Sequence, residues 1–301
     1  MSKVFITGAT GFIGSIVVDE LLSHGYKILG LARSDKSAEQ LTKKGVEVLK
    51  GDLENFDSIK EGVSKSDGVI HLGFIHDFSN MAHSYDIDFQ VSQVIVDAIK
   101  GTSKFFIYTS GLGGFGSDIG VKTFENTEID ADSINPFFRT RFLTETFVAE
   151  AASKNQIRTI VLRLPHSVHD KGDSGFVPHL IQFAQKNGVS YYVGEGKGKW
   201  PAVHRYDAAV AFRLAVEKGQ AGKSYHIVHE EGVETKKIAE AIGNKTGLKT
   251  ESLGYDQLES KLGFLGYFLA SNVEVSSEIT QKELGWTPKQ IGLLEDISRN
   301  Y

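Results

Sequence analysis

KVFITGATGFIGS, residues 3–15, decides the fold of this chain, because an apolar strand runs directly into a turn with three glycines spaced three residues apart. Gly8 permits a tight turn, Gly11 leaves the backbone open to a pyrophosphate, and Gly14 allows the helix to pack closely on the strand. The helix is expected to begin at about Phe12, so its first backbone N–H groups would face the phosphates. The alternative is a turn that binds no ligand. The pattern predicts a dinucleotide site built from Gly8, Thr10, Gly11, Phe12, Ile13 and Gly14.

Length and composition limit the class of protein. The 301 residues suffice for a large doubly wound domain with a small appendage or for two modest domains. A hydrophobic fraction of 41% and a formal net charge of -5 are those of an ordinary globular protein and give no reason to expect nucleic acid. The chain has no cysteine, which excludes disulfides and thiolate metal sites. An early first strand and the lack of a long apolar run predict no signal peptide, no membrane partner and a cytoplasmic enzyme.

Strands and helices alternate without a break as far as Leu164. This alternation predicts an α/β fold, a doubly wound parallel sheet of the Rossmann type. Beyond Leu164 turn residues gather, so we predict a dinucleotide-binding domain over 1–164, to which 202–228 returns, and a small C-terminal substrate-binding cap over 165–201 and 229–301. Asp207 is expected to cap a helix. Leu284 and Trp286 are expected to pack inward.

The end of the second strand bears on the choice of cofactor. Where NAD-binding folds place an acidic residue for the ribose 2′-hydroxyl, this chain has Ala32, Arg33 and Ser34. A permanently charged guanidinium suits a 2′-phosphate, so NADP(H) is predicted to be preferred, with NAD(H) as the alternative. The other reading is an arginine solvated at a strand end. Further cofactor contacts are predicted at Asp52, which is placed to accept from the adenine amino group, and at Leu53, Leu72, Gly73 and Leu164.

Hydroxyl and imidazole side chains supply the candidates for chemistry. Thr109 and Ser110 end the fifth strand, where ligands of parallel sheets bind, and are predicted to be catalytic. His71 lies inside an apolar strand and is predicted to be a core residue. After Leu164 the histidines have irregular spacing and no cysteine or orienting carboxylate, so no metal site is predicted. Substrate contacts are predicted at His76, Phe137, His166 and His204.

With these motifs the chain resembles the extended short-chain dehydrogenase/reductase superfamily, which includes nucleotide-sugar epimerases and dihydroflavonol-type reductases. The resemblance covers nearly the whole length and is carried by TGATGFIG at 7–14, GDL at 51–53, VIHLG at 69–73 and AVHRYDAA at 202–209. It implies a Rossmann fold and a nicotinamide cofactor. It also suggests a homodimer through the helices near 85–100 and 137–153.

The chain departs from the superfamily where the proton donor is usually found. The usual Tyr and Lys, four residues apart after a Pro, fall on Phe137 and Arg141 in NPFFRTRFLTE. The phenol is therefore absent from its usual place, and Asp88 stands where the superfamily carries a helical Asn. A guanidinium stays protonated and is a poor acid. The resemblance thus implies that Arg141 binds the nicotinamide ribose and contributes positive charge, as a cofactor-binding and catalytic residue without proton transfer.

These observations favour an NADPH-dependent oxidoreductase that reduces a small aldehyde or ketone. The superfamily's usual Ser falls on Gly111, so Ser110 or Thr109 would donate to the carbonyl oxygen. A proton would come from His76, His166 or water. Two alternatives remain open: a catalytically inactive NADP(H)-binding regulator or interaction protein, which the missing phenol supports, and a nucleotide-sugar epimerase, which it weakens.

Overall fold

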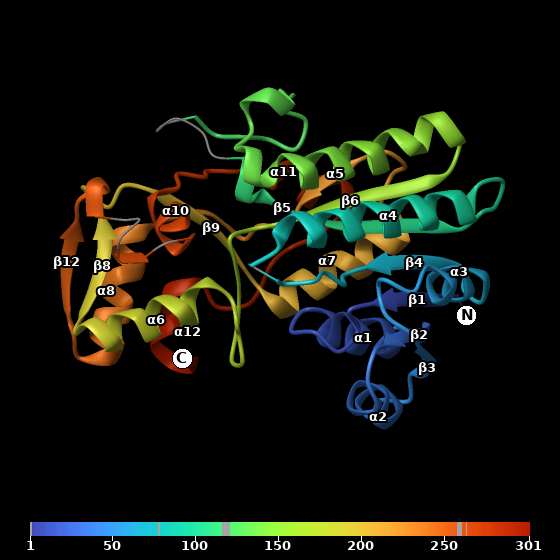
Figure 1. The fold of residues 1–301 in the computed structure, drawn as a ribbon, viewed down its shortest axis with the longest axis horizontal. Helices are drawn as coiled ribbons and strands as arrows, with labels where there is room; N and C mark the ends of the chain where they lie inside the picture. Colours follow the sequence, from blue (N-terminus) through green and yellow to red (C-terminus); the bar gives the residue numbers. More distant parts are fainter. Residues whose placement is uncertain (1, 78, 116–120, 258–260, 263) are drawn as a thin grey trace.

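A seven-stranded parallel sheet forms the centre of the computed structural model, which describes residues 2–77, 79–115, 121–257, 261–262 and 264–301. Its strand order is β10-β6-β5-β4-β1-β2-β3 (Figure 1). The strands are β1 (Lys3–Thr7), β2 (Lys27–Ala32), β3 (Glu47–Lys50), β4 (Gly68–His71), β5 (Phe105–Gly111), β6 (Arg158–Leu164) and β10 (Ser224–His226). The order reverses between β1 and β4, so a ligand crevice is expected at the carboxyl ends of these two strands.

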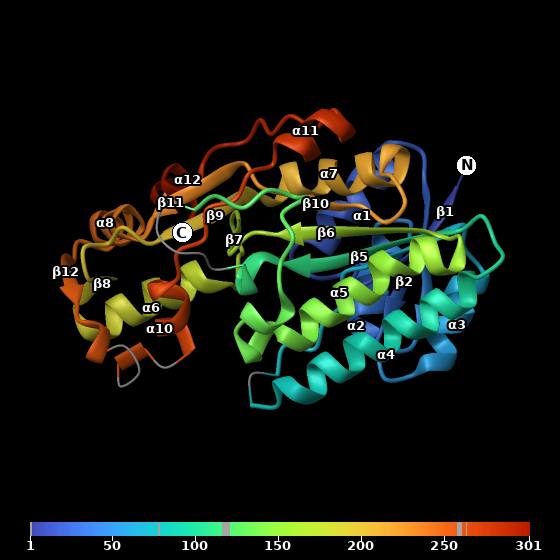
Figure 2. The same cartoon turned by 90° about the horizontal axis from the view of Figure 1, so that it is seen from above.

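Helices cover both faces of this sheet (Figure 2). One face carries α1 (Gly14–Ser23), α2 (Asp35–Lys43) and α7 (Arg205–Lys218). The other carries α3 (Phe56–Ser64), α4 (Met81–Ile99) and α5 (Pro136–Asn155). The predicted doubly wound Rossmann fold is therefore confirmed. Among the described helices, none is both long and apolar enough to cross a membrane.

A second, smaller core lies at the other end of the molecule, around Trp200, Phe268 and Leu293 (Figure 1). Its helices are α6 (Phe176–Asn187), α8 (Thr235–Thr246), α10 (Phe264–Ala270) and α12 (Leu293–Asn300). Its strands are the parallel pair β8 (Val189–Val193) and β12 (Lys249–Leu253), and the three-stranded sheet of β7 (Ser167–His169), β9 (Lys199–His204) and β11 (Glu230–Glu234). Short 3-10 turns lie at Leu112–Gly114, Ala131–Ser133 and Tyr255–Gln257.

The C-terminal segment contributes to both cores. Leu284, at the end of α11 (Glu278–Leu284), and Trp286 are buried in the core beside α7, and the Trp286 indole N–H donates to the Asp207 carbonyl over 3.0 Å. Both side chains are buried as expected, but they pack in the core of the large sheet and not in the predicted C-terminal cap. Ile297 of α12 belongs to the smaller core instead. The chain therefore crosses from one core to the other between α11 and α12.

Two local predictions were wrong. The first helix begins at Gly14 rather than Phe12, since the first residues after the strand are needed for the glycine turn. Asp207 does not cap α7, because the helix already begins at Arg205 and His204 accepts the N–H of Tyr206 through Nδ1. The Asp207 carboxylate instead receives the backbone N–H groups of residues 289 and 290, both at 2.9 Å, and so anchors the C-terminal segment.

Gly11 and Gly14 should respond differently to alanine. A Cβ on Gly14 would lie 2.1 Å from the Gly8 carbonyl oxygen, whereas one on Gly11 would lie 3.2 Å from the same atom. Overpacking of this kind costs roughly 1–3 kcal/mol, so Gly14→Ala is expected to lower the free energy of unfolding by that amount. Gly11→Ala should instead weaken dinucleotide binding with little loss of stability. Urea unfolding and cofactor titration of both variants measure this, and equal losses of stability would contradict it.

Candidate cofactor and active site

The glycine turn lies against the end of β4. Gly8 has a φ of 70°, and a Cβ there would approach the Gly73 backbone nitrogen to 2.7 Å. The Thr7 hydroxyl accepts the Gly73 N–H over 3.1 Å, which ties the ends of β1 and β4 together. Gly11 is exposed on the open side of the turn, and Thr10, Phe12 and Ile13 are partly exposed. The turn is thus closely packed below and open above, which fits the pyrophosphate of a dinucleotide.

A buried polar chain holds the neighbouring strands in register. The Thr7 hydroxyl lies 2.6 Å from His71 Nδ1, His71 Nε2 lies 3.3 Å from Asp88 of α4, and Tyr108 of β5 donates to the same carboxylate over 2.5 Å. His71 is 1% exposed, which confirms it as a core residue. Burial alone would raise the pKa of Asp88, but His71 and Arg141 hold it below its usual range. Asp88 therefore stays ionised beside the site.

Arg33 lies just past the end of β2 with its guanidinium available. It is exposed and forms no hydrogen bond or ion pair with the described residues, and the same holds for Lys36 in the first turn of α2. Ser34, also predicted to bind the cofactor, is the N-cap of α2, since its hydroxyl accepts the Ser37 N–H over 3.2 Å; its contact with the cofactor stays a prediction. Two cations without partners thus flank the place where the adenosine ribose is predicted to lie.

The other predicted cofactor residues lie along the same edge of the sheet. Asp52 is exposed beyond β3, and its Oδ1 accepts the backbone N–H groups of residues 54 and 55, at 3.0 and 2.9 Å. Leu53 and Leu72 are partly buried, and a Cβ on Gly73 would approach the Leu53 side chain to 3.2 Å. Leu164 ends β6 and is buried. This arrangement leaves their role as cofactor contacts a prediction.

The three predicted catalytic residues meet at the carboxyl end of β5. Arg141 of α5 donates from Nη2 to the Thr109 carbonyl over 2.8 Å, and its guanidinium lies 4.5 Å from the centre of the Phe74 ring. Ser110 and Arg141 line one small pocket together with Phe138. The Thr109 hydroxyl is buried and has no hydrogen-bond partner in the described part of the chain. Tertiary structure thus places a fixed cation beside two hydroxyl groups.

Neighbouring side chains keep Arg141 protonated and positively charged. Burial by itself would lower its pKa, but Tyr108, Asp88 and Tyr85 together raise the pKa above its ordinary value. The guanidinium therefore remains a cation at every physiological pH. This agrees with a positioning and electrostatic role and excludes proton donation by this residue.

Aromatic rings surround this cation, and sequence reasoning missed three of them, Phe74, Tyr85 and Phe138. Phe137, at the superfamily's tyrosine position, lies edge-on against Tyr85 of α4, with ring centres 6.0 Å apart, and Tyr85 also contacts Phe74 at 5.7 Å. Phe138 contacts Phe137 at 4.9 Å. Two signals were present: Phe74 directly follows the VIHLG motif, and Tyr85 lies one helical turn before Asp88 on the same buried face.

The candidate histidines do not gather into one group. His76 lies edge-on to Phe74 at 5.2 Å, and partial burial and Arg141 lower its pKa. His166 is stacked on Trp200 at 5.9 Å, and burial lowers its pKa to about 4. His166 is therefore neutral at pH 7, which counts against it as a source of an acidic proton. His179 is exposed on α6.

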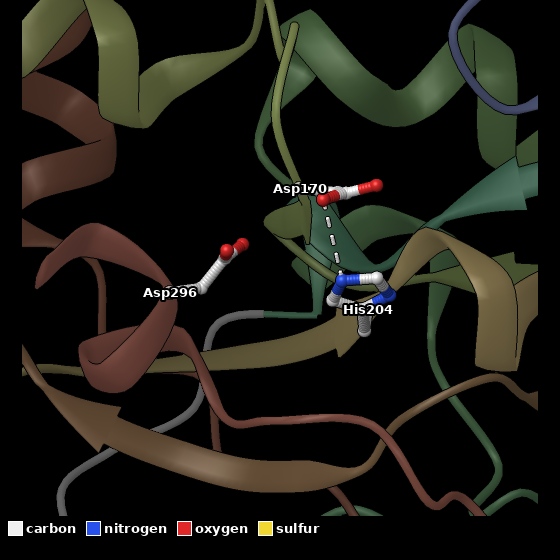
Figure 3. Close-up of side chains that lie close together, drawn as sticks. All are labelled: Asp170, His204 and Asp296. Carbon is white, nitrogen blue, oxygen red and sulfur yellow. Dashed lines mark ion pairs between the residues drawn. The ribbon is translucent and has the colours of Figure 1, made fainter. Parts of the chain in front are cut away.

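A second polar cluster joins the smaller core to the glycine turn. Asp170, His204 and Asp296 approach one another from three parts of the chain (Figure 3). His204 Nε2 lies 3.5 Å from Asp170, whose other oxygen accepts from Arg205 Nε over 2.7 Å. The Arg205 guanidinium lies 4.6 Å from the centre of the Phe12 ring. His204, predicted to contact substrate, is buried here, and its proposed role remains a prediction.

The cluster has the residue types of a metal site, but the ring nitrogen of His204 that faces Asp170 carries a proton. His204 Nδ1 accepts the Tyr206 N–H, so the ring proton resides on Nε2, the atom that faces Asp170. A protonated nitrogen has no lone pair for a cation. Asp170 is already neutralised by Arg205. These contacts favour a structural hydrogen-bonded network.

Comparison with known proteins places this geometry in a family. A model of the NAD dependent epimerase/dehydratase family matches residues 4–229. The uncharacterized protein YLL056C of Saccharomyces cerevisiae is 45% identical over 301 residues, which cover 99% of each chain. Sterol-4-alpha-carboxylate 3-dehydrogenase, decarboxylating, of Dictyostelium discoideum is 26% identical over 262 residues, covering 84% of this chain and 79% of its own. UDP-glucose 4-epimerase of Thermotoga maritima has the same fold, with a TM-score of 0.78, 20% identity, and coverage of 99% and 97%.

The fold and the glycine turn define a dinucleotide-binding α/β enzyme. The chain belongs to the NAD dependent epimerase/dehydratase family. The resemblance to extended short-chain dehydrogenases/reductases is thereby confirmed, as is the dependence of the family on a nicotinamide dinucleotide.

Proposed function

We propose that this protein is an NADPH-dependent reductase of a small aldehyde or ketone with an apolar body. The observation that carries the proposal is the group formed by Thr109, Ser110 and Arg141 at the carboxyl end of β5. When bound, the dinucleotide would supply a hydride to the carbonyl carbon. The protein's part is to stabilise the negative charge that develops on the carbonyl oxygen, and hydroxyl donors beside a fixed cation do this.

The preference for NADPH is supported by the charges beyond β2. Arg33 and Lys36 are exposed cations without partners among the described residues, and neither Ala32 nor Ser34 offers a carboxylate to a ribose 2′-hydroxyl. The 2′-phosphate that distinguishes NADPH from NADH carries negative charge, which a guanidinium binds well.

The lining of the pocket supports an apolar substrate. Phe138 lies between the pocket and the smaller core, where it contacts Tyr267 at 5.6 Å and Phe268 at 5.8 Å. Among the described residues that line the pocket, Arg141 is the one cation, and it is engaged by Thr109. A nucleotide sugar would bring two phosphates that need further cationic or amide partners. One relative is named a sterol-4-alpha-carboxylate 3-dehydrogenase, and the sterol part of that name denotes a large hydrocarbon body.

Oxidation of NADPH tests the proposal. The protein is mixed with NADPH and with propanal, benzaldehyde, 2-naphthaldehyde or cyclohexanone, and the loss of nicotinamide absorbance is followed. We expect steady turnover with at least one compound, and the aryl aldehydes should give the higher kcat/KM. Binding of NADPH without turnover of any carbonyl would favour the inactive regulator, and interconversion of UDP-glucose and UDP-galactose would favour an epimerase.

His166→Ala provides a test of the substrate side of the site. His166 makes ring contacts with Trp200 and Phe268, both of the smaller core. Because an aromatic contact contributes about 0.5–1.5 kcal/mol, we expect KM for an aryl aldehyde to rise about two- to tenfold while the Kd of NADPH stays unchanged. His179→Ala, on the exposed face of α6, is the control. Unfolding without a change in KM would identify His166 as a core residue only.

A further inference from the structure

Phe137 leaves the proposed reductase without a phenol at the superfamily's usual place, but a phenol from another element lies beside it. Tyr85 comes from the first turns of α4, and its ring is packed edge-on against Phe137, with centres 6.0 Å apart. A second contact joins Tyr85 to Phe74, with centres 5.7 Å apart. Phe74 in turn lies under the Arg141 guanidinium at 4.5 Å. Tyr85, Phe74, Phe137 and Arg141 therefore form one compact group.

We propose that Tyr85 is the proton donor of this enzyme and takes the place of the missing phenol at position 137. This inference rests on the proposed reductase function. The residue is otherwise unexplained: it is only 6% exposed, yet its hydroxyl forms no hydrogen bond with the described residues. A phenol that packs in a core normally directs its hydroxyl to a partner. The Tyr85 hydroxyl thus has no hydrogen-bond partner among the described residues, and under this proposal the substrate oxygen becomes its partner.

The surroundings of Tyr85 are those of a phenol kept in its acid form. Burial raises the pKa of Tyr85 to about 12, while Arg141 acts in the opposite direction. The phenol is thus protonated at neutral pH, as a donor must be. It is also far more acidic than an alcohol, so transfer of its proton to a developing alkoxide is favourable. The Tyr85 phenolate left after the transfer would be stabilised by the nearby Arg141 cation.

Proton transfer from Tyr85 completes the reduction of the carbonyl group. The carbonyl π bond breaks, its carbon receives one hydride, which carries both electrons, from the reduced nicotinamide, and its oxygen takes the proton as the Tyr85 O–H bond breaks. The products are the alcohol, the oxidised dinucleotide and the Tyr85 phenolate. Water then returns a proton to the phenolate. Thr109 and Ser110 donate hydrogen bonds to the carbonyl oxygen. The positive charge of Arg141 stabilises the negative charge on that oxygen and on the phenolic oxygen of Tyr85.

Tyr85→Phe tests the inference because it removes one oxygen and leaves the ring contacts. With the aldehyde that the wild type reduces fastest, kcat should fall about a hundredfold to ten-thousandfold, the range of general acid catalysis. The Kd of NADPH and the melting temperature should stay unchanged, because the Tyr85 hydroxyl forms no hydrogen bond with the described residues, those of the glycine turn included. Wild-type turnover should also stay level from pH 7 to 10, since the pKa of about 12 lies above this range.

Two further variants complete the experiment. Tyr26→Phe is the matched control and should retain full activity. Tyr26 directly precedes β2, at the amino ends of the strands, whereas the site lies at their carboxyl ends. Adding Phe137→Tyr to Tyr85→Phe restores a phenol beside Arg141 and should recover part of the rate, which a purely structural role of Tyr85 would not allow. Retention of kcat in Tyr85→Phe would overturn the inference while the reductase function stands. A wild type without turnover would overturn both.

Discussion

Arg141→Ala is expected to lower kcat about a hundredfold to a thousandfold, the usual effect of removing one preorganised electrostatic stabiliser. The guanidinium donates to the Thr109 carbonyl over 2.8 Å and lies 4.5 Å from the Phe74 ring centre, so it is held in one place before substrate arrives. Its loss would remove the positive charge beside Ser110 and Tyr85. Steady-state kinetics with NADPH and the best aldehyde measures the effect.

Variants of other residues in α5 distinguish the loss of the Arg141 charge from a loss of helix stability. Arg139→Ala removes a cation from the same helix, but Arg139 faces Asp132 at 3.5 Å and should tolerate the change. Phe137→Tyr alone should change the rate little, because Tyr85 already supplies a phenol. If Arg141→Ala and Ser110→Ala both keep the wild-type rate, the carbonyl oxygen is stabilised by other groups, and the proposed site is wrong.

Arg33→Ala is expected to weaken NADPH binding about tenfold to a hundredfold and to leave NADH nearly unchanged. The guanidinium is exposed and has no partner among the described residues, so its removal breaks no hydrogen bond or ion pair of the described part of the chain. A hydrogen bond to a charged group contributes about 1.5–3 kcal/mol, which corresponds to this change in Kd. Fluorescence titration with both cofactors measures it.

A matched variant controls for net charge. Lys43→Ala also removes one positive charge from the α2 region, but its side chain is 71% exposed and already paired with Glu39. Its affinity for both cofactors should equal that of the wild type. Equal losses for NADPH and NADH in Arg33→Ala would show that the arginine does not recognise a 2′-phosphate.

The linear sequence determined the features that depend on neighbouring residues. Apolar periodicity and the glycine spacing predict the strand, turn and helix of residues 3–23. The glycines are required locally, because a Cβ added at Gly14 would clash with the turn itself. The alternation of strands and helices predicted the parallel sheet. The carboxyl ends of β1, β4 and β5 then had to meet at one edge, which brought Gly73, Thr109 and Ser110 to the site.

Tertiary structure alone decided which side chains surround the reacting group. Tyr85 reads as an ordinary apolar-face residue of α4, and only the packing of α4 on α5 sets its ring against Phe137, more than fifty positions away. Only the fold shows that His204 is buried beside Asp170, and its contact with substrate stays a prediction. The α11–α12 segment crosses between cores because Asp207 holds backbone N–H groups from residues 289 and 290. Contacts between distant residues depend on how helices pack, and periodicity along the chain carries no record of them.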